Sequence, residues 1–213
     1  MASRLRIFDE DVLLVVDVQN DFCPGGRLAI READAVVPVI NRLAPLFRHA
    51  VLTQDWHPAG HLSFASSHSG KQPFETITLP YGEQTLWPDH CVQRTNGAEF
   101  HCELLVPCAE LILRKGFRPE VDSYSAFREN DRKTSTGLRG YLKERGFKRV
   151  FAVGLALDVC VRFSAEDAAA AGFDTYVIED ACRAVDPGAG LEAASQAMRK
   201  AGVSMIASNA FGA

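Results

Sequence analysis

The chain has 213 residues, of which 47% are hydrophobic and 23% charged, values ordinary for one globular domain with a substantial core. Its formal net charge is −4, and its basic residues form no tract, so we expect no nucleic-acid partner. No apolar run approaches the length that spans a bilayer, which argues against a membrane partner.

The N-terminal segment and the cysteines favour a cytoplasmic protein. Residues 1–8 are not followed by the apolar stretch of a signal peptide, because an acidic cluster comes next. The six cysteines show neither the close spacing of a secreted disulfide scaffold nor the paired spacing of a zinc ribbon. A reducing compartment is the simpler interpretation.

Short apolar runs rich in β-branched residues alternate with amphipathic stretches. In chain order the pattern predicts a strand over residues 12–18, a helix over 33–48, strands over 50–53 and 110–114, a helix over 136–145, a strand over 149–154, a helix over 158–171, a strand over 175–178, a helix over 190–200 and a strand over 203–206. Glycines 146, 172 and 202 follow the last three helices and suit their C-terminal ends. This alternation predicts a parallel sheet covered on both faces.

The stretch of residues 57–107 is too long for an ordinary connection, so we expect a functional excursion with little regular structure.

Two charged residues end apolar runs that we read as neighbouring strands. Asp17 ends the first run and Lys115 the third. Ligands of parallel sheets bind beyond the carboxyl ends of the strands. Each residue alone would be unremarkable, as a loop aspartate or a surface lysine. If the two face each other, the ammonium keeps the carboxylate charged.

Cys160 lies where a predicted strand turns into a helix. In the first helical turn, the backbone N–H groups and the macrodipole favour a thiolate and could bind an oxyanion. The alternative is a buried cysteine that packs as a small hydrophobe. We assign that packing role to the other five cysteines, which are Cys23, Cys91, Cys102, Cys108 and Cys182.

A carboxylate and three histidines gather in and before the excursion. They are Asp55, His57, His61 and His90. Asp55 and His57 are two residues apart, which places both side chains on one side of an extended segment. Three imidazoles and a carboxylate suit one Zn²⁺, Fe²⁺ or Mn²⁺ ion and do not distinguish among them. The remaining histidines, His49, His68 and His101, are interpreted as structural or surface residues.

Taken together, these segments resemble the isochorismatase-like cysteine hydrolases and, within them, the nicotinamidase (pyrazinamidase) family. The resemblance covers nearly the whole chain. The segments that carry it are VVDVQNDFCPGG, TQDWHP, HLSFAS, LWPDHCVQ, GAEFH, RKGF, DSYSAF, GLALDVCV and EDACRAV.

The resemblance implies one Rossmann-like α/β domain over residues 1–213, a three-layer sandwich with a six-stranded parallel sheet and a metal-binding excursion at about 55–107. It implies a triad of Asp17, Lys115 and Cys160, and one divalent ion held by Asp55, His57, His61 and His90 with water. It implies a substrate pocket walled by Phe22, Leu28, Trp87 and Tyr124. It also implies oxyanion donors at the backbone N–H groups of Ala156 and Cys160, and a cis peptide between Leu155 and Ala156.

The implied activity is hydrolysis of nicotinamide to nicotinate and ammonia through a cysteine thioester, and of pyrazinamide to pyrazinoate, with a place in NAD salvage. Another amidase of this family, acting on ureido or carbamoyl substrates, remains open, because Leu157 and Val159 replace the threonine and tyrosine of the commoner GLATDYCV pattern. A vinyl-ether hydrolase would need neither the cysteine nor the metal. A non-catalytic metal-binding protein would not need the triad. A homo-oligomer is also open.

Overall fold

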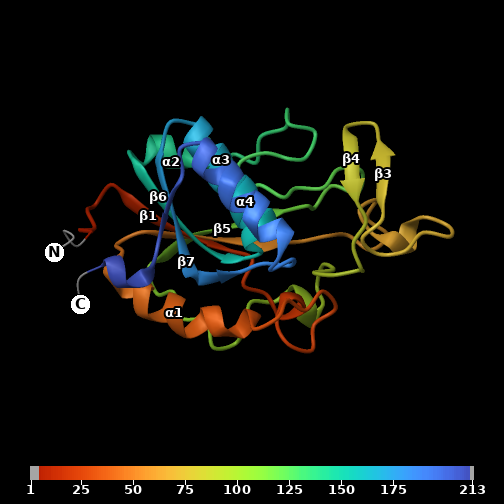
Figure 1. Cartoon of the computed structure of the whole chain (residues 1–213), viewed down its shortest axis with the longest axis horizontal. Coiled ribbons are helices and arrows are strands. Elements are labelled where there is room, and N and C mark those ends of the chain that lie inside the picture. Colours follow the sequence, from red (N-terminus) through yellow and green to blue (C-terminus); the bar gives the residue numbers. More distant parts are fainter. Residues whose placement is uncertain (1–4, 212–213) are drawn as a thin grey trace.

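A six-stranded, fully parallel sheet organises the computed structural model, which describes residues 5–211 (Figure 1). The strand order is β5-β2-β1-β6-β7-β8. The strands are β1 (Asp11–Val16), β2 (Ala50–Asp55), β5 (Ala109–Lys115), β6 (Arg149–Leu155), β7 (Asp174–Arg183) and β8 (Ser204–Ile206). All six predicted strands are present, and the predicted fold class is confirmed.

Helices cover both faces of this sheet. Helix α1 (Val36–Leu43) lies on one face, and α2 (Leu138–Glu144), α3 (Arg162–Ala170) and α4 (Ala189–Lys200) lie on the other (Figure 1). The buried central strand β1 alternates between the two resulting cores. Leu13 and Val15 join the core under α1, whereas Leu14 and Val16 join the core under the other three helices. Burial on both faces explains the continuous apolar runs of the central strands.

Three predicted boundaries were wrong for local reasons. Strand β1 ends at Val16 because Asp17 adopts a left-handed conformation, with φ of 47°. The helix predicted over 33–48 is only α1, flanked by 3-10 turns, since Pro45 has no N–H to continue the helical hydrogen bonds. The helix predicted over 158–171 begins as a π-helical turn, Leu157–Val161, that continues into α3.

The excursion between β2 and β5 contains little regular structure, as predicted. It holds a two-stranded antiparallel hairpin of β3 (Thr76–Leu79) and β4 (Gly82–Thr85), which stands apart from the main sheet in Figure 1. The remaining short elements are 3-10 turns at Asn20–Phe22, Ala33–Ala35, Ala44–Leu46, Ala65–Ser67, Asn96–Ala98 and Ser208–Ala210. Within residues 5–211, no helix has the length and apolar character needed to cross a membrane.

Candidate active site

Asp17, Lys115 and Cys160 come together at the carboxyl ends of the strands. Asp17 follows β1, Lys115 is the last residue of β5, and Cys160 lies in the π turn after β6. Lys115 Nζ is 2.8 Å from Asp17 Oδ2 and 3.5 Å from Cys160 Sγ. The prediction that β1 and β5 are neighbours was wrong, because β2 lies between them. The long lysine side chain bridges that gap.

Lys115 is shared between two carboxylates. Its ammonium group is fully buried, contacts Asp55 Oδ1 as well as Asp17, and donates to the carbonyl oxygen of Ser123 at 3.0 Å. Burial alone would lower the pKa of this lysine, but the two carboxylates outweigh burial and raise the pKa well above its usual value. Lys115 therefore stays charged and ties the cysteine side of the site to the Asp55 side.

Asp17 is fully buried, and its Oδ1 accepts a 2.6 Å hydrogen bond from Thr53 Oγ1. Burial raises the pKa of Asp17 above its usual value, and the opposing effects of Lys115 and Thr53 only moderate the rise. The predicted role of Lys115 in stabilising the carboxylate has the expected direction. However, the net balance favours proton uptake more than the sequence indicated, which makes Asp17 a stronger base.

Burial opposes the thiolate that the helical turn of Cys160 favours. This cysteine is buried, and burial raises the pKa of its thiol well above the usual value, although Lys115 acts in the opposite direction. Nearby Asp17 and Asp55 add to the rise. The Cys160 sulfur and one oxygen from each of these carboxylates all lie within 4.8 Å of one another. The surroundings of Cys160 therefore favour the thiol over the thiolate, with a carboxylate within reach.

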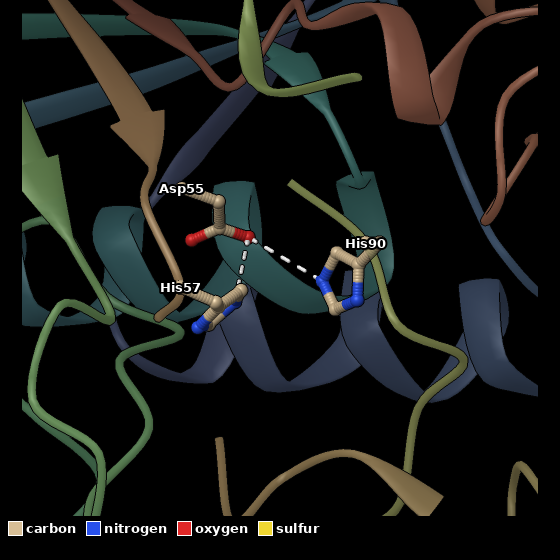
Figure 2. Close-up of side chains that lie close together, drawn as sticks. All are labelled: Asp55, His57 and His90. Carbon is tan, nitrogen blue, oxygen red and sulfur yellow. Dashed lines mark ion pairs between the residues drawn. The ribbon is translucent and has the colours of Figure 1, made fainter. Parts of the chain in front are cut away.

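Asp55, His57 and His90 form a second cluster beside the first (Figure 2). The Nε2 atoms of His57 and His90 each lie 3.8 Å from Asp55 Oδ2. The Nδ1 atoms lie 2.9 Å from the Gly116 carbonyl oxygen and 2.8 Å from the Pro88 carbonyl oxygen, respectively. A carbonyl only accepts, so Nδ1 carries the proton in each ring and the Nε2 lone pair is free to face Asp55.

This arrangement has the chemistry of a metal site. Metal-binding histidines usually donate their second N–H to a carbonyl or carboxylate, which fixes the ring. The three candidate ligand atoms lie within 4.8 Å of one another. Burial opposes ionisation of Asp55, but Lys115 and the two histidines lower its pKa well below the usual value. Two imidazole nitrogens and an ionised carboxylate fit a divalent cation.

His61 is not part of that cluster. Its ring centroid is 4.6 Å from that of His57, yet its nitrogens are occupied by other groups. Nδ1 accepts a hydrogen bond from the Ser63 backbone N–H at 3.1 Å and lies 2.7 Å from Ser63 Oγ. The proton then belongs on Nε2, which faces the Val121 carbonyl oxygen at 3.4 Å. With this tautomer both nitrogens are engaged by protein groups, although one ligand atom each of His57, His61 and Asp122 lie within 4.8 Å of one another.

The four residues predicted to bind substrate all line one pocket with a volume of about 340 Å³, including its mouth. Phe22, Leu28, Trp87 and Tyr124 form walls, and Cys160 and Ala156 lie on the same surface. Ala156 follows a cis peptide from Leu155, as predicted. Lys115 and Asp17 do not line the pocket and lie buried behind it.

Sequence reasoning missed Asp122, which lines this pocket and is buried. Its Oδ1 is 3.9 Å from His57 Nε2. The segment DSYSAF carried the signal, but only its tyrosine was assigned a role. Val159, noted above as a departure from the family pattern, also lines the pocket, whereas Leu157 does not. The packing role assigned to Cys102 was wrong, since that cysteine is exposed.

The isochorismatase domain model matches residues 11–210, and the chain belongs to this family. A nicotinamidase from Acinetobacter baylyi is 56% identical over 208 residues, which cover 98% of this chain and 97% of that protein. The structure of a nicotinamidase/pyrazinamidase from Acinetobacter baumanii superposes with a TM-score of 0.94 at 56% identity, covering 96% of this chain and 99% of that one. A pyrazinamidase from Pyrococcus horikoshii in complex with zinc has a TM-score of 0.76 at 34% identity, covering 93% and 99%.

Proposed function

We propose that this chain, acting as one domain, is an amidohydrolase that converts nicotinamide to nicotinate and ammonia, and pyrazinamide to pyrazinoate. The observation that carries the proposal is that Lys115 contacts both the Cys160 thiol and the Asp17 carboxylate. Cys160 also lines an aromatic pocket, and a candidate metal cluster lies beside it. The full-length similarity to nicotinamidases favours these substrates over ureido or carbamoyl compounds.

In the proposed mechanism, Cys160 Sγ attacks the carboxamide carbon while Asp17 accepts the thiol proton. The bond to nitrogen then breaks, the proton passes from Asp17 to the leaving group, and ammonia departs from a thioester. Asp17 next takes a proton from water as the water attacks the thioester. Return of that proton to sulfur releases the acid and restores the thiol.

The backbone N–H groups of Ala156 and Cys160 are the proposed donors to the oxyanion. Ala156 lies just after β6 and just before the π turn, and its N–H donates no hydrogen bond within residues 5–211. Loss of one such donor typically costs about 3–4 kcal/mol in the transition state. Lys115 keeps its charge beside Asp17 and positions that carboxylate for both proton transfers.

Asp55, His57 and His90 are the residues that would hold a divalent ion. Such an ion supplies a Lewis-acid contact for the ring nitrogen of the substrate. Phe22 and Trp87 position the ring by contact with its faces and edges. The structure of a pyrazinamidase homologue in complex with zinc supports the binding of a metal.

Ammonia release from nicotinamide, pyrazinamide and an N-carbamoyl amino acid tests the substrate class. We expect turnover of the first two and little of the third. Cys160→Ala should reduce kcat by at least about 1000-fold with an unchanged fold, and Cys102→Ala is the matched control because that thiol is exposed and does not line the pocket. Near-native turnover by Cys160→Ala, or preferential turnover of the carbamoyl compound, would contradict the proposal.

A further inference from the structure

We propose that Asp158 is a positioning residue for substrate binding, which holds Val185 in place as one wall of the substrate pocket. This inference rests on the proposed function and concerns a carboxylate that the proposed mechanism does not use. Asp158 lies in the same π turn as Cys160, whereas Val185 lies in the loop between β7 and α4. The chain thus brings a carboxylate beside the reactive cysteine into contact with a separate segment of the pocket.

Both oxygens of the Asp158 carboxylate accept hydrogen bonds from that loop. Oδ1 accepts from the Val185 backbone N–H at 2.9 Å, and Oδ2 accepts from the Asp186 backbone N–H at 2.8 Å. Hydrogen bonds to an ionised carboxylate are stronger than those between neutral groups. These two contacts, which we call the Asp158 clamp, tie the π turn to the loop between β7 and α4.

The loop has few other connections that could place Val185. Strand β7 ends at Arg183, so strand pairing does not extend to this residue. The Val185 and Asp186 N–H groups donate to Asp158 and to no other group within residues 5–211. The carboxylate and carbonyl oxygens of Asp186 accept only from N–H groups of the loop itself and of the first turn of α4. The position of Val185 therefore depends on the Asp158 clamp.

The loop borders two cavities. Val185 lines the substrate pocket together with Val159 and Cys160. Its neighbours Ala184 and Pro187 instead line a second cavity, which has a volume of about 860 Å³ including its mouth. Because that cavity leaves space on the far side of the loop, packing from that side does not by itself press Val185 against the pocket.

The π turn keeps its own shape without the clamp. The N–H groups of Val159 and Val161 donate to the Ala156 carbonyl oxygen at 3.1 and 3.0 Å. Loss of the clamp should therefore release Val185 and leave Cys160 where it is. The substrate ring would lose a wall of its pocket while the reacting atoms keep their places, which raises KM more than it lowers kcat.

The first test is the steady-state kinetics of the full-length protein with nicotinamide. Asp158→Asn keeps the side-chain shape but turns an amide N–H₂ toward one of the two backbone donors. It should raise KM by about 10-fold and change kcat by less than about 3-fold. Asp158→Ser is the second variant in case Asp158→Asn does not fold.

Two further variants separate the clamp from a general loss of stability. Val185→Ala should also raise KM, and the double variant with Asp158→Asn should raise it no further, because both changes remove the same contact with the ring. Asp180→Asn is the matched control. Asp180 likewise accepts from a distant segment, at the Ser208 N–H and hydroxyl, but does not line the pocket, and this variant should keep the wild-type KM.

Hydrogen exchange followed by mass spectrometry tests the clamp without substrate. The Val185 and Asp186 amides should exchange at least about 10-fold faster in Asp158→Asn than in the wild type, since a hydrogen bond to a charged group contributes at least that factor. The same amides should exchange at the wild-type rate in Asp180→Asn.

A lower kcat at unchanged KM in Asp158→Asn would assign this carboxylate to the position of Cys160 and overturn the proposal. Additive effects on KM in the double variant, or unchanged exchange of the two amides, would overturn it as well. If the wild type does not hydrolyse nicotinamide while Asp158→Asn accelerates exchange, the proposed function fails and the clamp stands.

Discussion

Lys115 contacts several groups of the candidate site in addition to Asp17. The sequence predicted only that this ammonium keeps the Asp17 carboxylate charged. In the structure the same ammonium group contacts Asp17, Asp55 and the Ser123 carbonyl oxygen, and it lies 3.5 Å from the Cys160 sulfur. A substitution at this position therefore affects both clusters at once.

We predict that Lys115→Ala lowers kcat by about 100-fold or more, because the proton transfers lose an oriented base. Two buried carboxylates would also be left without their cation, which costs about 3–5 kcal/mol of stability. Lys115→Arg should restore little activity, because the planar guanidinium does not fit a cavity made for a point-like ammonium. The measurements are kcat, KM and thermal denaturation. A variant that keeps wild-type kcat and only raises KM would remove Lys115 from the triad.

At the residue scale, sequence reasoning identified the reactive side chains but not their protonation states. Asp17, Lys115 and Cys160 could be identified because each ends or follows an apolar run that becomes a strand. Their protonation depends on burial, which the sequence does not state. The helical turn of Cys160 favours a thiolate, whereas burial raises the pKa of its thiol, and only the structure states that burial. Asp122 was missed because it lies in a loop without a strand before it.

Among the elements, the turn after β5 orients His57, because Gly116 in this turn has no side chain and leaves space for the imidazole ring. Gly116 has φ of 65°, and a Cβ there would lie 2.5 Å from His57 Cε1 and 2.8 Å from Nδ1. Its carbonyl oxygen also accepts the Nδ1–H bond of the same ring. A side chain at this position would push the imidazole away from Asp55.

We therefore expect Gly116→Ala to reduce Zn²⁺ affinity by about 10-fold or more. Gly70→Ala is the control, because Gly70 has a similar φ of 75° but open space around its Cβ position. The two variants share the backbone strain and differ in the clash with His57. Equal zinc affinities in the two would show that the clash does not matter. The measurement is metal content after dialysis, together with chelator competition.

The β3–β4 hairpin reaches the pocket through one buried side chain, Gln84. Its Nε2 donates to Tyr124 Oη at 2.7 Å and to Asp122 Oδ2 at 3.2 Å. Its Oε1 accepts from Tyr81 Oη and from Asn130 Nδ2, each at 3.1 Å. The hairpin, remote from the sheet in Figure 1, thereby holds one aromatic wall of the pocket.

Gln84→Ala should raise KM for nicotinamide by about 10-fold with a smaller change in kcat, because it loosens ring binding rather than the reacting atoms. The lost hydrogen bonds leave buried partners unsatisfied and cost about 1–3 kcal/mol. Glu83→Ala, at the exposed neighbouring position of the same strand, should behave as wild type. Steady-state kinetics on both variants test this prediction. A lower kcat with an unchanged KM would contradict a role of Gln84 in ring binding.

Element by element, periodicity predicted the sheet well and the helix starts less well. Glycines 146, 172 and 202 end their helices as expected, each with φ between 79° and 87°. The start of α3 could not be predicted, because the sequence LDVCV forms a π turn that no spacing of apolar residues distinguishes from an α-helix. The hairpin was also missed, since β3 and β4 are four residues each and bury only one side chain, that of Gln84.

For the whole molecule, the candidate metal cluster joins segments that are distant in the chain. Asp55 ends β2, His57 opens the excursion, and His90 follows the hairpin within it. An ion bound by all three residues would close the excursion onto the sheet. The energetic consequence is that the folded state gains stability from the ion and the unfolded state does not.

Removal of the metal should therefore lower the melting temperature. At an ion concentration about 1000 times Kd, the stabilisation is about 4 kcal/mol, which for a chain of this size corresponds to about 8–16 °C. Differential scanning fluorimetry with and without chelator measures it. His90→Ala should melt at the same temperature in both conditions, and a chelator effect that persists in this variant would place the stabilising ion elsewhere.

The single lysine held between Asp17 and Asp55 also makes the two clusters thermodynamically linked. An ion that withdraws charge from Asp55 weakens the attraction between Asp55 and Lys115, and the ammonium becomes more fully available to Asp17. Reciprocity requires the converse: whatever alters the charge at Asp17 alters ion affinity by the same free energy. Each protonation of Asp17 during turnover would then change the affinity for the ion. This buried ammonium group would thereby couple the reaction at the Cys160 sulfur to the binding of the substrate ring.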